Sequence, residues 1–119
     1  MESDKILEVA VKAIDAKRGE DIVVLDVSTV SVLADYFVIA SAFSERQLNA
    51  LLDHVVEEVE KAGGVLKRIE GKDSGKWILV DFSDVVVHLF QSGEREFYNL
   101  EKLWRDAPMV DVSDFLIEE

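Results

Sequence analysis

The segment KWILVDFSDVVVHLFQ, Lys76 to Gln91, constrains the fold more than any other part of the chain. It is strongly apolar, yet two aspartates and a histidine interrupt it. Because side chains alternate between the two faces of a β-strand, the pattern predicts strands over 76–82 and 85–91. Ser83–Asp84 is expected to form the tight turn between them, with Asp84 serving the geometry of that turn.

The two expected strands carry different residues on their two faces. One face is wholly apolar and is assigned to the core, with Ile78, Val80, Phe82, Val85, Val87 and Leu89. The opposite face mixes apolar and aromatic residues with a carboxylate and an imidazole, and it holds Trp77, Leu79, Asp81, Val86, His88 and Phe90. A two-residue turn would pair Asp81 with Val86 and Trp77 with Phe90.

The mixed face allows two interpretations. Large aromatic side chains next to charged ones are typical of a surface that binds another protein. Alternatively, a helix covers this face, and Asp81 and His88 satisfy each other's hydrogen bonds beneath it.

The rest of the chain predicts one α/β domain. Apolar residues at helical spacing indicate a helix from Ser3 to about Lys17, a second helix opened by the capping box at Ser44–Gln47, and a last one over 94–104. The β-rich runs 21–28, 35–41 and 65–71 predict three further strands, of which 35–41 is interior and 65–71 lies near an edge. The order describes a single domain with a mixed β-sheet flanked by helices.

Composition narrows the class of protein. The chain has 119 residues, no cysteine and a formal net charge of −12, and it contains no apolar run of the roughly 18 residues that a membrane span needs. Its acidic start lacks the features of a signal peptide, so we expect a soluble cytoplasmic protein. The negative charge repels phosphates, which favours docking on a basic protein over direct nucleic-acid binding; solubility is the alternative role of the charge.

Four segments carry a resemblance to a known family. DYFVIAS, SERQLNALLD, EGKDSGKWILVDFSDVVVHLF and REFYNLEKLWRDA occur in this order over most of the chain. Together they resemble the Iojap-type ribosomal silencing factors. The resemblance assigns residues 1–107 to the silencing factor domain and leaves 108–119 as an acidic C-terminal tail. Two departures lie at expected turns and concern local backbone shape: Ala42–Phe43 and Ser83 stand where relatives commonly have glycine or a small residue.

The resemblance implies a function and a partner. Members bind the fourteenth large-subunit ribosomal protein on the large ribosomal subunit, block joining of the small subunit and repress translation when nutrients are short. The family implies a nucleotidyltransferase-like fold without enzyme activity, no cofactor and a possible homodimer. On this interpretation, partner contacts involve an expected anchor set of Trp77, Phe90 and Tyr98, acidic residues Glu70, Asp81 and Glu101 that meet lysine or arginine, and His88 on the same face.

Two other classes of function make demands that this sequence meets poorly. A nucleotidyltransferase-fold enzyme acting on a nucleotide would need carboxylates close together on one strand to hold metal ions. Asp81 and Asp84 instead straddle a turn, and no phosphate-binding glycine motif is present. A metal-binding module would need three or four ligands. The two histidines, His54 and His88, have too few suitable neighbours in the sequence, and a solvated helix face explains His54 better.

Overall fold

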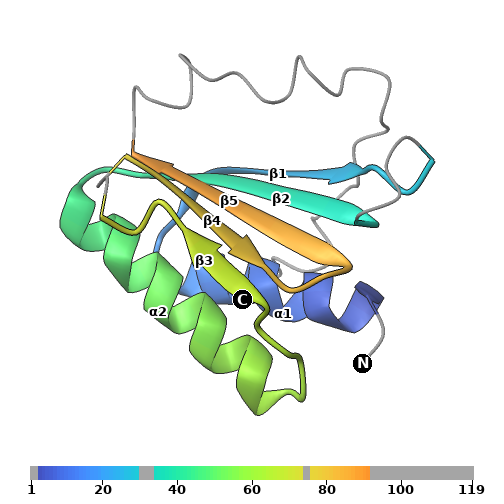
Figure 1. Cartoon of the computed structure of the whole chain (residues 1–119). Helices are drawn as coiled ribbons and strands as arrows, with labels where there is room; N and C mark the ends of the chain where they lie inside the picture. The colour runs from blue at the N-terminus through green and yellow to red at the C-terminus, as the bar shows by residue number, and fades with distance from the viewer. Residues whose placement is uncertain (1–2, 30–33, 74–75, 92–119) are drawn as a thin grey trace.

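The computed structural model describes residues 3–29, 34–73 and 76–91 (Figure 1). In chain order, the elements are α1 (Ser3–Ala16), β1 (Glu20–Asp26), β2 (Tyr36–Ala42), α2 (Glu45–Lys61), β3 (Arg68–Glu70), β4 (Trp77–Asp81) and β5 (Val85–Gln91). The predicted order of helices and strands is confirmed over these residues. The expected helix over 94–104 and the tail 108–119 lie outside them.

The strands form one mixed sheet in the order β1-β2-β5-β4-β3. β2 and β5 are parallel, whereas the other neighbouring pairs are antiparallel. Both described helices lie on the same face of this sheet, below it in Figure 1. The predicted α/β domain with a mixed sheet is therefore confirmed, and β2 is an interior strand as expected. β3 is an edge strand, but it is shorter than the predicted 65–71.

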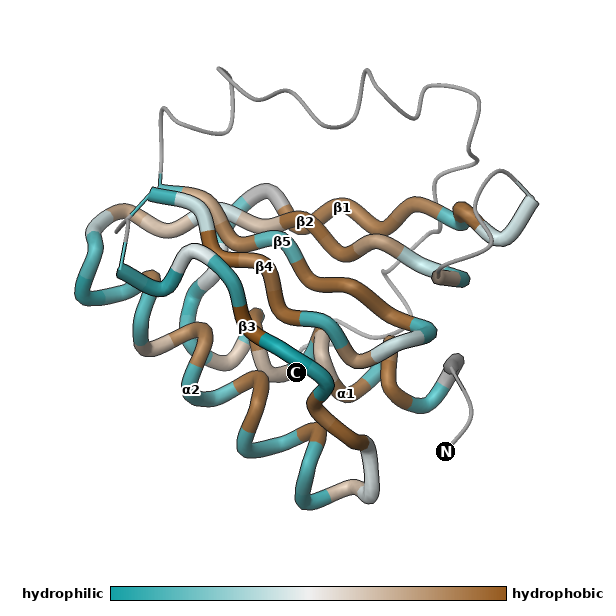
Figure 2. Tube along the Cα trace, in the orientation of Figure 1, coloured by the Kyte–Doolittle hydropathy of each residue, from teal (hydrophilic) through white to brown (hydrophobic). Residues whose placement is uncertain are grey.

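The main core lies between the two helices and the sheet. The face of β4 and β5 that was predicted to be apolar is buried here, and Val80 and Val87 have no exposed surface. The apolar stripes of α1 and α2 meet it from the other side, as the brown segments in Figure 2 show. Ala62, the last residue of the predicted α2 stripe, instead lies at the helix C-cap and is exposed.

The β4–β5 hairpin has the predicted register. Trp77 pairs with Phe90, and Asp81 pairs with Val86. In the turn, an Asp81 carboxylate oxygen accepts a hydrogen bond of 2.7 Å from the Ser83 N–H, and the Asp84 N–H donates to the Phe82 carbonyl oxygen at 3.1 Å. Ser83 has φ = 79°, a left-handed conformation that glycine adopts more readily. The departure at Ser83 therefore falls where backbone shape favours glycine.

The capping box of α2 also joins the two helices. The Gln47 N–H donates to Ser44 Oγ at 3.1 Å, and Gln47 Oε1 accepts from the Phe43 N–H at 2.6 Å. The Gln47 side-chain amide then donates to the carbonyl oxygens of Lys17 and Arg18, at 3.2 and 2.9 Å, just beyond the end of α1. One side chain thus caps the start of one helix and holds the end of the other.

No helix among the described residues is both long and apolar enough to span a bilayer.

Candidate partner-binding site

The side of the sheet that faces away from α1 and α2 is called the second face. Buried apolar residues from β1, β2 and β5 and the adjoining segments form its interior, and they are Leu25, Val27, Ala34, Ile39 and Phe90. Half-buried residues pack against them, namely Val23, Phe37, Trp77 and Val86. The second face is thus a separate apolar cluster whose outer members remain partly accessible.

Four rings meet at the β4 end of this face, and we call them the aromatic cluster: Phe37, Trp77, His88 and Phe90. The Trp77 and Phe90 rings stack with their centroids 5.3 Å apart and their planes at 17°. Phe37 packs against His88 at 4.9 Å between centroids. The Trp77 Nε1–H donates a long hydrogen bond of 3.4 Å to His88 Nδ1. Stacking and hydrogen bonding together hold the half-buried indole in one orientation.

His88 is a supporting residue of this cluster. Its side chain is buried, with 5% of the residue exposed, and burial lowers its pKa from 6.5 to about 4. The imidazole is therefore neutral near pH 7. Since Nδ1 accepts from Trp77, the proton resides on Nε2. That N–H finds no hydrogen-bond partner within the part of the chain that the structure describes.

The residues of the expected contact set differ in how accessible they are. Phe90 has no exposed surface and His88 is nearly as buried, so in this conformation they lie beneath Trp77 and support it. The alternative of a buried Asp81–His88 pair is wrong, because Asp81 bonds to the turn and to Arg68.

Three predicted contact residues are accessible in the structure. Trp77 and Asp81 are half-buried, and Glu70 is exposed. The predicted residues Tyr98 and Glu101 lie outside the described residues.

Arg68, Glu70 and Asp81 lie beside the aromatic cluster, and we call them the charged corner. Arg68 Nη1 lies 2.9 Å from Glu70 Oε2, and Arg68 Nε lies 3.3 Å from Asp81 Oδ2. β3 brings these groups together, since it pairs Arg68 with Asp81 and Glu70 with Leu79. Sequence reasoning missed Arg68. The only signal for it was the charged edge strand, whose register against β4 could not be read from the pattern.

A pocket of about 160 Å³ adjoins the charged corner, lined by Glu70, Gly71, Trp77 and Leu79. Gly71 is necessary here, because it has φ = 82° and a β-carbon at this position would collide with the Trp77 carbonyl oxygen. A wider groove of about 530 Å³ lies elsewhere, between α2 and β3. Its floor is apolar, with Leu52, Val56 and Ile69, and its rim carries both acidic and basic side chains.

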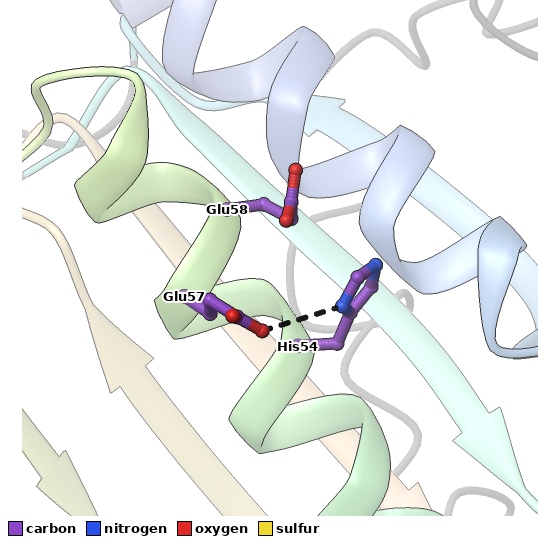
Figure 3. Close-up of side chains that lie close together, drawn as sticks. All are labelled: His54, Glu57 and Glu58. Atoms are coloured by element: carbon purple, nitrogen blue, oxygen red, sulfur yellow. Dashed lines mark ion pairs between the residues drawn. The ribbon is translucent and has the colours of Figure 1, made fainter.

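A further cluster lies on α2, where His54, Glu57 and Glu58 bring their potential ligand atoms within 4.8 Å of one another (Figure 3). His54 Nδ1 is 3.9 Å from Glu57 Oε1, and Glu58 Oε2 is 3.3 Å from Lys61 Nζ. Structural zinc sites are almost always closed by four ligands, whereas one helix supplies three here. The Glu58 carboxylate also already has a cation beside it.

The sequence and the fold of this chain are similar to those of known proteins. The family model described as "Ribosomal silencing factor during starvation" matches residues 1–119. The ribosomal silencing factor RsfS of Bacillus subtilis is 45% identical over 112 residues, which cover 94% of this chain and 95% of that protein. RsfS of Halalkalibacterium halodurans is 41% identical, with coverage of 94% and 96%. A crystal structure of a Chromobacterium violaceum protein superposes with a TM-score of 0.85 at 37% identity and covers 88% of both chains. The chain therefore belongs to the ribosomal silencing factor family.

Proposed function

We propose that this protein represses translation by binding the large ribosomal subunit and blocking the joining of the small subunit. Membership of the ribosomal silencing factor family supports a role at the ribosome. The resemblance of the sequence motifs to that family names the fourteenth large-subunit ribosomal protein as the partner and nutrient limitation as the condition.

The observation that carries the proposed binding site is the position of Trp77. Its indole is half-buried on the second face, stacked on Phe90 and hydrogen-bonded to His88. Tryptophan residues dominate the binding energy of many interfaces, particularly where the free protein already holds them in place. We assign Trp77 the role of apolar anchor, Glu70 and Asp81 that of acidic contacts, and Phe90 and His88 that of support. Tyr98 and Glu101 complete the proposed contact set.

Charge supports a basic protein as the partner. The chain carries a formal net charge of −12, and the charged corner sets two carboxylates against one guanidinium. Complementary charge accelerates association and aligns the two surfaces. We therefore place the contact on ribosomal protein rather than on ribosomal RNA, in the cytoplasm, with a homodimer as a possible free form.

We assign the protein no catalytic step. Of the two carboxylates nearest to an enzyme-like arrangement, Asp81 is used differently, because it bonds to the Ser83 N–H of the turn and to Arg68. Asp84 lies beyond the turn, three residues further along the chain. Titration with magnesium and a labelled nucleotide checks this assignment. Saturable nucleotide binding would instead favour the nucleotidyltransferase-fold alternative.

The function is tested by mixing the purified protein with both ribosomal subunits and separating the products on a sucrose gradient. The peak of joined ribosomes should shrink as protein is added, and the protein should sediment with the large subunit. An unchanged joined peak at saturating protein contradicts the proposal. A protein that sediments with the small subunit contradicts it as well.

A further inference from the structure

The pocket beside Trp77 has the size of a single side chain. It encloses about 160 Å³, whereas sites for cofactors and drug-sized ligands enclose roughly 300–1,000 Å³. We propose that this pocket is a receptor for one arginine side chain presented by the partner. The inference rests on the proposed function for its biological setting, but the pocket can be tested without the ribosome.

The walls of the pocket match the two parts of an arginine side chain. Trp77 and Leu79 supply an aromatic and an aliphatic surface, and Glu70 supplies a carboxylate. The register of β3 against β4 places Glu70 directly beside Leu79. An arginine can lay its methylene stem on such apolar surface, stack its guanidinium on an indole and donate to a carboxylate at the same time. Lysine has a compact ammonium that cannot stack on the indole as a planar guanidinium does.

The pocket is built before any partner arrives. Trp77 is oriented by its stacking on Phe90 and by its hydrogen bond to His88. Gly71 also lines the pocket and lies directly against the Trp77 backbone, where a β-carbon would collide with the Trp77 carbonyl oxygen. A preformed site loses little conformational entropy on binding, so even one inserted side chain can contribute measurably.

The charged corner holds two carboxylates that share one guanidinium in the ion pairs of the described residues. Arg68 contacts both Glu70 and Asp81, so one positive charge faces two negative ones. Arg68 is not among the residues that line the pocket. Glu70 can accept from a second guanidinium besides Arg68, because a carboxylate offers about four acceptor positions.

The pocket is tested with Nα-acetyl-arginine amide as the probe and Nα-acetyl-citrulline amide as its uncharged isostere, at near-physiological salt. Two-dimensional amide NMR follows the Trp77 indole N–H and the Gly71 backbone N–H. The arginine probe should shift both signals saturably, and the citrulline probe should bind at least about tenfold more weakly, because it lacks the charge-assisted bond. Equal responses to the two probes, or none, overturn the proposal.

Two matched variants connect the pocket to the ribosome. Glu70→Gln and Glu60→Gln each remove one exposed carboxylate, but Glu60 lies on α2, away from the pocket. Only Glu70→Gln should weaken binding of the arginine probe and of large subunits, each by about fivefold or more. If the protein binds large subunits but not the arginine probe, the arginine pocket is wrong and the proposed function stands. If it binds the probe but not large subunits, the pocket stands and the proposed function is wrong.

Discussion

At the scale of single residues, His88 links the second face to pH. Burial lowers its folded-state pKa to about 4, below the ordinary value of 6.5. Between pH 6.5 and pH 4, His88 is mostly protonated in the unfolded chain but mostly neutral in the folded protein. The free energy of unfolding therefore falls as pH decreases from 6.5 to 4. The contribution of this one group is roughly 3 kcal/mol, because one pKa unit corresponds to about 1.4 kcal/mol.

The His88→Gln variant isolates this effect, since glutamine cannot titrate but still offers an acceptor to Trp77. Denaturant unfolding of both proteins at pH 7 and pH 4 gives the difference in stability at each pH. The wild type should lose roughly 3 kcal/mol more than the variant over this interval. Carboxylate titration is common to both proteins and cancels in the comparison. Parallel losses would show that His88 takes up its proton in the folded state.

At the scale of secondary-structure elements, Gln47 couples α1 to α2. Its side chain accepts one hydrogen bond at the start of α2 and donates to two carbonyl oxygens after α1. We expect Gln47→Ala to destabilise the domain by about 1–2 kcal/mol, because it removes the Gln47 half of the capping box and the bridge to α1. Thermal melts measure the loss.

Gln47→Glu separates the two roles of this residue. Glutamate can still accept from the Phe43 N–H, but it cannot donate to the carbonyl oxygens of Lys17 and Arg18 and places a carboxylate near them. We expect this variant to lose about 1 kcal/mol or more. If it is as stable as the wild type, the bridge to α1 contributes nothing.

At the scale of the whole molecule, periodicity predicted most of the architecture. The faces and register of β4 and β5 followed from alternation, and the start of α2 followed from its capping box. Alternation does not reveal depth, however: Phe90 and Trp77 share a face, yet only Phe90 is fully buried. The Arg68–Asp81 contact and the bridge from Gln47 to α1 also escaped prediction, because both depend on the packing of segments distant in the sequence.

The division between core and contact surface yields a paired prediction. Val80→Ala removes fully buried methyl groups and should destabilise the domain by roughly 1–3 kcal/mol, without weakening subunit binding while the protein is folded. Trp77→Ala should weaken binding of the large subunit by about thirtyfold or more, equivalent to about 2 kcal/mol. Circular dichroism melts and co-sedimentation well below the melting temperature separate the two losses. A Trp77→Ala protein that is folded and binds normally would remove Trp77 from the site.

The charge of the whole molecule predicts how binding depends on salt. A protein of net charge −12 that docks on a basic protein should associate more slowly as salt screens the attraction between them. The same charge should prevent binding to protein-free ribosomal RNA at every salt concentration, because both molecules are negative. Stopped-flow association with large subunits over a salt series measures the first effect, and filter binding to the purified RNA measures the second. Tight binding to the RNA would place the contact on phosphates and overturn the assignment of a ribosomal protein as the partner.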